Sequence, residues 1–458
     1  MNREAVSGLV QLMAAAAPPG RPHLDDADRR RLRSLTHRLI AARPDAAAEH
    51  DRFLAIGTRG LALPAAALTE RLRDATVLVT GGTGCIGSAL LRELAAFGPG
   101  RLVSVSRGVT GSRADESVEY AHADISNRDA LVSVVEAVRP SVIFHVAAQR
   151  DPGLAETEVH RTLSTNILGT RNVLSAAAAA AVPQVVYAST GKALRPYSPD
   201  MYTASKRAAE WITTEAARAG GLLCSAARFT HVVDNSIIYR RLLGWAADPD
   251  ATIRLHSPDI AFYAQSARES AQLLLLALLG ARRGELRVHA ITDLGWPVSL
   301  LDLTLSVLGR RIGETGASDL PPVYFSGYDA GYEEVPFPGL YDPLTAGDVS
   351  PLLNAFEAAA ATGSPSPQAD AFRLELARDP RPHTLLAALV GACERTREPD
   401  LLRRAMNKLS WALLDTTLRA APGTALARSA ALAKAHWDTM GADHRRVLEM
   451  ISDSAGAP

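Results

Sequence analysis

The sequence predicts an α/β fold with a doubly wound parallel sheet, because apolar segments alternate with helical ones around a glycine-rich turn. Short apolar segments that suit buried strands occupy residues 75–80, 101–106, 141–146 and 184–189. Segments of helical composition follow at 88–97, 128–138 and 162–181. Strands that alternate with helices pair in parallel through crossover helices.

The turn after the first predicted strand has the composition of a dinucleotide-binding loop. It reads Gly81-Gly82-Thr83-Gly84-Cys85-Ile86-Gly87 and precedes a helix. Its glycines permit a tight turn, close approach of the backbone to a pyrophosphate, and close packing of helix on strand. The N-terminus of the following helix favours bound phosphate. We therefore expect a Rossmann-type fold and dinucleotide binding here, rather than a merely structural glycine turn.

The second predicted strand ends in Ser106 and Arg107. Many folds of this class carry an acidic residue there, which accepts the ribose hydroxyls of NAD, whereas arginine suits a 2′-phosphate. The alternative is a solvated surface arginine. The sequence therefore favours NADP as the cofactor and leaves NAD as the other candidate.

Tyr202 and Lys206 lie four residues apart in a segment of good helix formers at 201–215. This spacing places both side chains on one face of a helix. A nearby ammonium favours the phenolate of a tyrosine and brings its pKa toward the range useful for removing a hydroxyl proton. The spacing alone also suits ordinary surface packing, so the reading depends on the cofactor motif upstream.

Taken together, these residues resemble the extended short-chain dehydrogenase/reductase family over residues 75–345. The segment 142–210 is most similar to the nucleotide-sugar 4,6-dehydratases of capsule and flagellin-glycan polysaccharide biosynthesis. The matching motifs beyond the glycine turn are Asp124-Ile125, Ala147-Ala148, Thr165-Asn166 and Gly169-Thr170, and the trio Thr190, Tyr202 and Lys206. The resemblance implies that Asp124 and Ile125 contact adenine, and that Ala147, Ala148 and Asn166 lie beside the cofactor.

The same resemblance assigns roles to the catalytic residues. It implies that Tyr202 removes the proton of a sugar hydroxyl while hydride passes to the nicotinamide, and that Lys206 tunes Tyr202 and holds the nicotinamide ribose. Thr190 would hydrogen-bond the reacting oxygen. Lys192 matches the base that removes the proton next to the new ketone.

This chain departs from the dehydratase pattern on the substrate side. The dehydratases carry an aspartate, the acid for the departing hydroxyl, where this chain has Gly191. Loss of a positioned general acid typically costs about 10² to 10⁴ in rate. Gln149, Arg150 and His231 also replace other residues at positions that face the substrate in that family. We therefore expect a rebuilt substrate pocket beside a retained cofactor pocket.

Two residues offer a replacement acid, each with a simpler alternative. Asp200 precedes the helix of Tyr202 and suits a helix cap more often than an acid. His231 is either a substrate ligand or acid, or an ordinary hydrogen-bonded histidine at a strand end.

Composition narrows the class of protein. The chain has 458 residues, 47% of them hydrophobic and 21% charged, with a formal net charge of zero. This composition is typical of a soluble globular protein. A net charge of zero produces no positive electrostatic potential that would attract nucleic acid or an anionic membrane. The three cysteines are scattered, so we expect no metal site, and neither a signal peptide nor a bilayer span is indicated. A cytoplasmic protein fits best.

Three regions are predicted. Residues 1–74 form a helical extension, 75–345 form the core, and 346–458 form a helical C-terminal region. Within the core, 75–228 would bind the cofactor and 229–345 would form a small substrate subdomain. The apolar stripes of the C-terminal helices could pack on the core, form a separate bundle or make a subunit interface. We expect a homo-oligomer.

Three functions follow from these features. The leading hypothesis is an NADP-dependent or NAD-dependent epimerase or oxidoreductase that acts on a nucleotide-activated sugar or a related polyol through Tyr202. The second is a 4,6-dehydratase whose acid has moved to Asp200 or His231. The third is a cofactor-binding interaction protein without catalysis, which the intact trio of Thr190, Tyr202 and Lys206 argues against.

Overall fold

The structure is a computed structural model and describes residues 3–108, 117–315, 320–329, 340 and 349–456. Contacts divide the chain into two compact units. The first, called the sheet unit, comprises residues 60–230, 268–293 and 330–458. The second, called the small unit, comprises residues 1–59, 231–267 and 294–329.

The sheet unit is built on nine strands. Their bounds are β1 (Thr76–Thr80), β2 (Arg101–Ser106), β3 (Val118–His122), β4 (Val142–His145), β5 (Gln184–Thr190), β6 (Leu223–Phe229), β11 (Arg287–Ile291), β14 (Ala361–Gly363) and β15 (Ala369–Arg373). Their order is β14-β15-β11-β6-β5-β4-β1-β2-β3. Neighbours from β3 to β11 are parallel, whereas β15 pairs antiparallel with both β11 and β14. The predicted Rossmann-type, doubly wound fold is confirmed.

The strand order reverses between β1 and β4, which pair directly with each other. In open parallel sheets, ligands bind outside the carboxyl ends of the strands at such a reversal. Thr80 at the end of β1 faces His145 at the end of β4 in this register. The glycine turn and the segment containing Ala147 therefore leave the sheet side by side.

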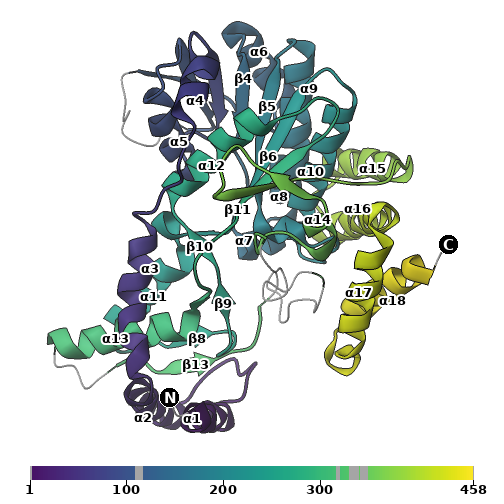
Figure 1. The fold of residues 1–458 in the computed structure, drawn as a ribbon. Coiled ribbons are helices and arrows are strands. Elements are labelled where there is room, and N and C mark those ends of the chain that lie inside the picture. Colours follow the sequence, from purple (N-terminus) through teal and green to yellow (C-terminus); the bar gives the residue numbers. More distant parts are fainter. Residues whose placement is uncertain (1–2, 109–116, 316–319, 330–339, 341–348, 457–458) are drawn as a thin grey trace. The chain divides into compact units, whose positions relative to one another are not determined.

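Helices cover both faces of this sheet (Figure 1). On one face, α6 (Arg128–Val138), α9 (Gly169–Ala179) and α10 (Met201–Arg218) lie side by side. On the other face, Glu93 of α5 (Cys85–Ala95) accepts hydrogen bonds at 3.1 Å from Arg268 and Gln272 of α12 (Ala267–Gly280). The remaining helical elements before β6 are α4 (Ala65–Leu72), α7 (Pro152–Thr157), α8 (Val159–Leu163), the π-helix η2 (Ser164–Leu168) and the 3₁₀-helix η3 (Gly191–Leu194).

The small unit combines the N-terminal extension with the predicted substrate part. Its helices are α1 (Arg3–Ala16), α2 (Asp26–Ala42), η1 (Pro44–Ala48), α3 (Glu49–Ile56), η4 (Val233–Asn235), α11 (Ile237–Ala247) and α13 (Leu300–Thr315). Three strand pairs accompany them: β7 (His231–Val232) with β10 (Ala264–Gln265), β9 (Ala261–Phe262) with β12 (Val298–Ser299), and β8 (Ile253–Leu255) with β13 (Val323–Phe325).

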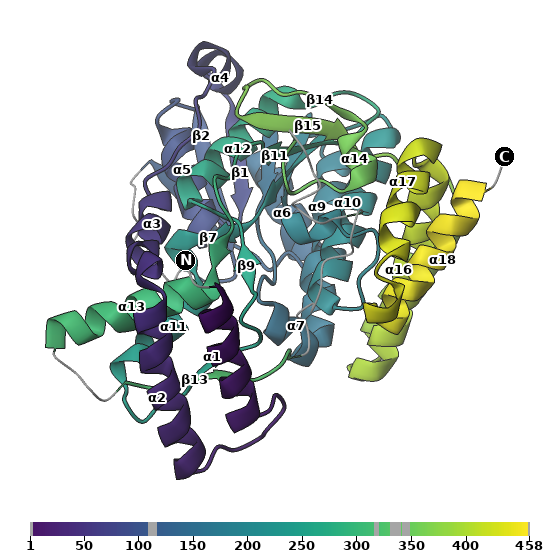
Figure 2. The ribbon, with the colours of Figure 1, turned by 60° about the horizontal axis from the view of Figure 1, so that its bottom comes forward.

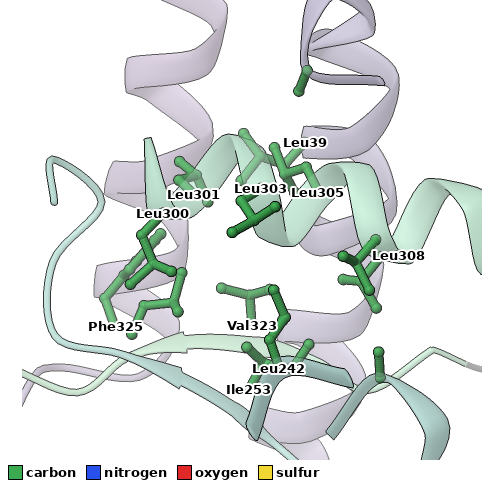
Figure 3. Packing of buried hydrophobic residues seen from close by; sticks show 14 of the residues in the cluster. Leu39, Leu242, Ile253, Leu300, Leu301, Leu303, Leu305, Leu308, Val323 and Phe325 are labelled. Atoms are coloured by element: carbon green, nitrogen blue, oxygen red, sulfur yellow. The ribbon is translucent and has the colours of Figure 1, made fainter. Parts of the chain in front are cut away.

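One apolar core holds the small unit together. Leu39 of α2, Leu242 of α11 and Leu308 of α13 are buried in it beside Val323 (Figure 3). One hydrogen bond adds to this packing, because the hydroxyl of Thr36 on α2 accepts the amide of Val323 at 3.0 Å. The N-terminal extension up to residue 59 therefore shares its core with segments from the middle of the chain, which the sequence did not indicate.

The C-terminal region is helical, as predicted, but it also adds β14 and β15 to the sheet. Its helices are α14 (Ala355–Ala358), α15 (Arg381–Arg395), α16 (Pro399–Ala420), α17 (Gly423–Lys434), η6 (Trp437–Thr439) and α18 (Ala442–Gly456) (Figure 2). The apolar stripe of α16 is buried, and its Thr417 accepts a hydrogen bond at 3.1 Å from Arg207 of α10. Of the three alternatives left open by the sequence, packing on the core is the one seen.

Across the described part of the chain, no helix combines the length and the apolar character needed to cross a membrane.

Candidate functional site

The glycine turn has the close backbone contacts that a pyrophosphate cradle needs. Gly81 has a φ of +75°, and a Cβ there would lie 2.8 Å from the Cα of Ala147. A Cβ at Gly87 would overlap the carbonyl oxygen of Gly81. Only glycine therefore fits at both positions. The residues present fit a dinucleotide phosphate, since the cradle stays open only without side chains.

The rest of the turn leads into the N-terminus of α5. Thr83 and Gly84 are exposed, and Gly84 occupies the N-cap position. Cys85 and Ile86 begin the helix and are partly buried. An exposed helix N-terminus suits a phosphate anion, because the first amides of a helix have no acceptor within the helix.

Replacing Gly87 with alanine is expected to weaken dinucleotide binding by about 10- to 100-fold, because overpacking against backbone costs about 1 to 3 kcal/mol. Gly221→Ala is the matched control, since nothing lies within 4 Å of a Cβ there. Titration of each purified variant with NADPH, followed by fluorescence, measures the two dissociation constants. Equal constants for both variants would remove the turn from the binding site.

The residues predicted to contact the adenosine part of the cofactor follow strands β2 and β3. Arg107 follows β2 and is exposed, while the hydroxyl of Ser106 donates to the carbonyl of Gly108 at 3.0 Å. Asp124 accepts the amide and the hydroxyl of Ser126, each at 2.8 Å, which fixes the turn after β3. Ile125 is buried and would contact a Cβ at Gly169 of α9, so it packs that helix closely.

Asn166 connects the two halves of the candidate site. It is buried in the π-helix η2, a type of helix that is often found at functional sites. Its side chain accepts the amide of Gln149 at 2.8 Å and donates to the carbonyl of Gln149 and the hydroxyl of Ser205, both at 3.0 Å. Ser205 stands between Tyr202 and Lys206 on α10. Asn166 therefore fixes the segment after Ala147 and Ala148 against the helix that carries the tyrosine.

Tyr202, Thr190 and Lys206 gather at the end of β5. Thr190 lies close enough to the phenol of Tyr202 to lower its pKa. Lys206 is buried, and its Nζ donates to the carbonyl of Ala188 at 2.7 Å and lies 4.4 Å from the ring centroid of Tyr187. The predicted association of the trio in one site is present in the folded chain.

The pKa of Tyr202 differs from the sequence-based expectation. Burial raises the pKa of this phenol above its ordinary value, while the hydrogen bond with Thr190 and the charge of Arg150 oppose the rise. Burial also lowers the pKa of Lys206 to about 7, against the opposing charge of Glu210. The raised pKa of Tyr202 was not expected, because the burial of both groups was not visible in the sequence. The tuning of Tyr202 by Lys206 stays a prediction.

Replacing Lys206 with methionine is expected to change how stability depends on pH. The pKa of Lys206 is about 7 in the folded chain, against an ordinary value of 10.5. Between these values the unfolded chain binds more protons, so this lysine makes the folded chain gain stability as the pH rises. From about pH 7 to pH 9, the free energy of unfolding of the wild type should rise relative to the variant by about 1 kcal/mol per pH unit.

Chemical denaturation of both proteins at several pH values in this window checks the expectation. If the free energies of unfolding of the wild type and the variant change by the same amount with pH, the low pKa of Lys206 is contradicted.

The turn after β5 carries Gly191 and Lys192. Gly191 is buried and Lys192 is partly buried in η3, where the amide of Lys192 donates to Thr190 Oγ1 at 3.4 Å. Asp200 is the N-cap of α10 and accepts the amide of Thr203 at 2.7 Å, and its other carboxylate oxygen accepts the hydroxyl of Ser198. The capping role predicted for Asp200 is confirmed.

The predicted substrate residues fall into two groups. Gln149 and Arg150 follow Ala148 in the sheet unit. Arg150 is exposed, and its charge lowers the pKa of Tyr202. His231 belongs to the small unit, where its Nε2 shares a hydrogen bond of 2.6 Å with Ser236 and its ring lies 4.6 Å from that of Phe262. Burial lowers the pKa of His231 to about 4, so it is neutral at pH 7. A neutral, hydrogen-bonded histidine matches the simpler of its two predicted readings.

A buried group of four charges beneath η3 was missed by sequence reasoning. It consists of Arg207 and Glu210 on α10, Arg228 on β6 and Glu357 on α14, and it is called the charge cluster below. Arg228 is 0% exposed and lies 2.8 Å from Glu210 and 2.6 Å from Glu357. Arg207 lies 3.4 Å from Glu210 and 3.2 Å from Glu357. The only signal in the sequence is an Arg and a Glu three residues apart in a helix that proves to be buried.

The charge cluster also contacts the end of β5 and η3. Ser189 donates to Glu210 at 2.6 Å, and Arg228 donates to the carbonyl of Ala193 at 3.3 Å. The guanidinium of Arg228 therefore lies inside the protein, between the carboxylates of Glu210 and Glu357. A second missed residue is Glu156 of α7, which accepts the amide of Met201 at 2.6 Å. Burial raises the pKa of Glu156, as does the nearby charge of Asp200.

Comparisons with known proteins show the family to which the chain belongs. The family described as polysaccharide biosynthesis protein matches residues 77–331. Capsular polysaccharide biosynthesis protein CapD of Staphylococcus aureus is 27% identical over 305 residues, which cover 61% of this chain and 48% of CapD. UDP-glucose 4-epimerase of Rickettsia felis is 26% identical over 257 residues, which cover 52% of this chain and 72% of the epimerase.

A solved structure shows the same fold. Pen from Bacillus thuringiensis has a TM-score of 0.55 at 22% identity, over 66% of this chain and 88% of Pen. The chain spans about half the length of the curated polysaccharide-biosynthesis proteins it matches first.

Proposed function

The chain belongs to the polysaccharide biosynthesis protein family of extended short-chain dehydrogenases/reductases, and from this premise we propose that it modifies a nucleotide-activated sugar by hydride transfer at one carbon. Relatives in the family include an enzyme named as a UDP-glucose 4-epimerase. The reaction proposed is epimerisation or net oxidation and reduction. The grouping of Tyr202, Thr190 and Lys206 at the end of β5 is the observation that carries the proposal.

In the proposed reaction, the turn from Gly81 to Gly87 holds the pyrophosphate of a dinucleotide, and Lys206 lies beside its ribose. A nicotinamide dinucleotide supplies the hydride acceptor when bound. Tyr202 accepts the proton of the sugar hydroxyl, and Thr190 holds the same oxygen through a hydrogen bond. The burial that raises the pKa of Tyr202 also makes it a strong base once it is deprotonated.

Lys192 supports epimerisation as the outcome. A ketone acidifies the neighbouring carbon, and an amine at Lys192 can remove and return a proton there. The chain has no carboxyl group between Thr190 and Lys192. The carboxylate of Asp200 is engaged as a helix cap. These features favour return of the hydride over loss of water.

A 4,6-dehydratase is the second candidate, and Glu156 is the observation that favours it. Its pKa is raised by burial, so it retains a proton more readily than an ordinary glutamate. It accepts the amide of Met201, next to Tyr202. A protonated carboxyl there could serve as the acid that the dehydratase reading places on Asp200 or His231.

Incubation of the purified full chain with UDP-sugars and NADP in deuterated water, followed by NMR, separates the two candidates. Deuterium incorporated beside the reacting carbon, with the sugar otherwise intact, supports epimerisation. A 4-keto-6-deoxy product that is lost in Lys192→Ala supports dehydration. Absence of turnover and of deuterium uptake across the panel would contradict both.

We also propose NADP as the cofactor, with Arg107 as its 2′-phosphate ligand. Arg107→Ala is expected to weaken NADPH binding by about 10-fold or more and to leave NADH binding unchanged, since a charge-assisted hydrogen bond contributes about 1.5 to 3 kcal/mol. Titrations with both dinucleotides measure this. Equal loss for both would assign the arginine a structural role.

A further inference from the structure

The space beside Gly191 is filled by a residue of the C-terminal region. A Cβ at Gly191 would lie 2.7 Å from Cδ2 and 3.5 Å from Cγ of Leu352. Leu352 is itself buried, at 5% exposure. The carbonyl oxygen of Phe229 lies 3.5 Å from the same Cβ position, on β6. Gly191 is therefore enclosed, and a larger side chain between Thr190 and Lys192 requires the end of the Leu352 side chain to shift.

The segment that carries Leu352 is fastened on both sides. The carbonyl of Leu352 accepts Arg228 Nη1 at 3.0 Å, and Asn354 Nδ2 donates to the carbonyl of Leu194 at 2.6 Å. The amide of Ser350 donates to Asp370 on β15 at 2.7 Å. These contacts tie the segment to the charge cluster, to η3 and to the sheet. Movement of its backbone would break several buried hydrogen bonds at once.

We propose that Leu352 is a specificity-determining and positioning residue, which fills the space that an acidic side chain at position 191 would occupy and packs against η3, the catalytic turn that carries Lys192. The C-terminal region would thus complete the active site. This inference rests on the proposed function, because it concerns which reaction follows oxidation of the sugar.

The chemistry explains why filling this space matters. Loss of water from a 4-keto sugar requires Lys192 to take the proton of C5, the C6–O bond to break, and an acid to protonate the departing hydroxide. Without an acid at that place, the proton removed by Lys192 can only return to carbon. The hydride then returns to the ketone, and the products are the original sugar and its epimer. The wild-type site therefore favours proton return over elimination, and Leu352 occupies the place where the missing acid would lie.

A double-mutant cycle tests the packing without any substrate. The variants are Gly191→Asp, Leu352→Ala and their combination, each examined by thermal denaturation. Gly191→Asp is expected to lower the melting temperature, because its side chain meets Leu352. The double variant should be more stable than the sum of the two single losses predicts. Additive losses would overturn the inference, whatever reaction the enzyme catalyses.

Kinetics then test the role in the reaction. Leu352→Ala is expected to lower kcat for deuterium exchange by about 10- to 100-fold with little change in KM, since Lys192 loses its fixed position. Leu389→Ala is the matched control. Leu389 is fully buried in α15 of the same region, so it should lose stability and keep its kcat.

The double variant should also shift the products toward the 4-keto-6-deoxy sugar. If the stability losses are coupled, but Leu352→Ala keeps its kcat and the double variant keeps its products, the catalytic part of the inference is overturned. If the wild type acts on no nucleotide sugar, the proposed function fails, whereas the stability cycle still reports on the packing of Leu352.

Discussion

Replacing Tyr202 with phenylalanine is expected to lower the rate of hydride transfer by about 10² to 10⁴, because the variant keeps the ring and loses the proton acceptor. The phenol is held by Thr190 at the end of β5, and removing it leaves the helix and its cap at Asp200 intact. Binding of NADPH should stay within about threefold of the wild type, since the variant retains the glycine turn. Stopped-flow absorbance of NADPH with a UDP-sugar measures the rate.

The matched control is Tyr120→Phe in β3, the edge strand of the sheet. It also loses one hydroxyl and should keep full activity. If Tyr202→Phe retained wild-type rates in every assay, the cofactor-binding interaction protein would become the better reading of the chain. Thr190→Val gives an independent check, because it removes the hydrogen bond to the phenol and should lower kcat more than it changes KM.

The cofactor half of the fold was predictable because its signals are local. The observed bounds of β2 and α6, Arg101–Ser106 and Arg128–Val138, coincide with the predicted ones. The pattern of apolar residues within each segment specifies the element, and Asn127 marks the start of α6 as its N-cap. Neither signal depends on residues that are distant in the sequence. The glycine turn and the helix of Tyr202 are predictable for the same reason.

The parts that were not predicted depend on contacts between distant segments. Arg228 and Glu357 are 129 residues apart, and neither residue is unusual in its own segment. β15 is a short strand that becomes recognisable only when it pairs with β11. The small unit is assembled from three stretches of chain, so its core is not apparent in any single stretch. The raised pKa of Tyr202 was not predicted for a related reason, since burial is a property of the folded chain.

Glu357→Gln is expected to lower the free energy of unfolding by about 3 to 5 kcal/mol, which is the usual cost of leaving a buried charge without its partner. The charge cluster holds two arginines and two glutamates, and its residues are all buried. Burial disfavours the charged form of Arg228, but Glu210 and Glu357 outweigh it and raise the pKa of this arginine. Without Glu357, two guanidinium groups would share the single carboxylate of Glu210.

Two further variants separate the effect of charge balance from the loss of a hydrogen bond. Glu119→Gln removes the carboxylate of an exposed ion pair with Arg101, and it should cost at most about 1 kcal/mol. The combination Arg228→Met with Glu357→Gln leaves one arginine and one glutamate, so it should be less destabilised than the two single variants together predict. Chemical denaturation of five proteins at one pH measures the differences: the wild type, Glu357→Gln, Arg228→Met, their combination and Glu119→Gln.

The outcome bears on function as well as on stability. Arg228 and Glu357 anchor the segment of Leu352, and Arg228 also donates to Ala193 in the catalytic turn. At temperatures where Glu357→Gln is still folded, its kcat should fall while NADPH binding is retained, because the loosened segment no longer holds the turn. A variant that unfolds at lower denaturant yet keeps the full kcat of the wild type would show that the cluster stabilises the fold without positioning the site.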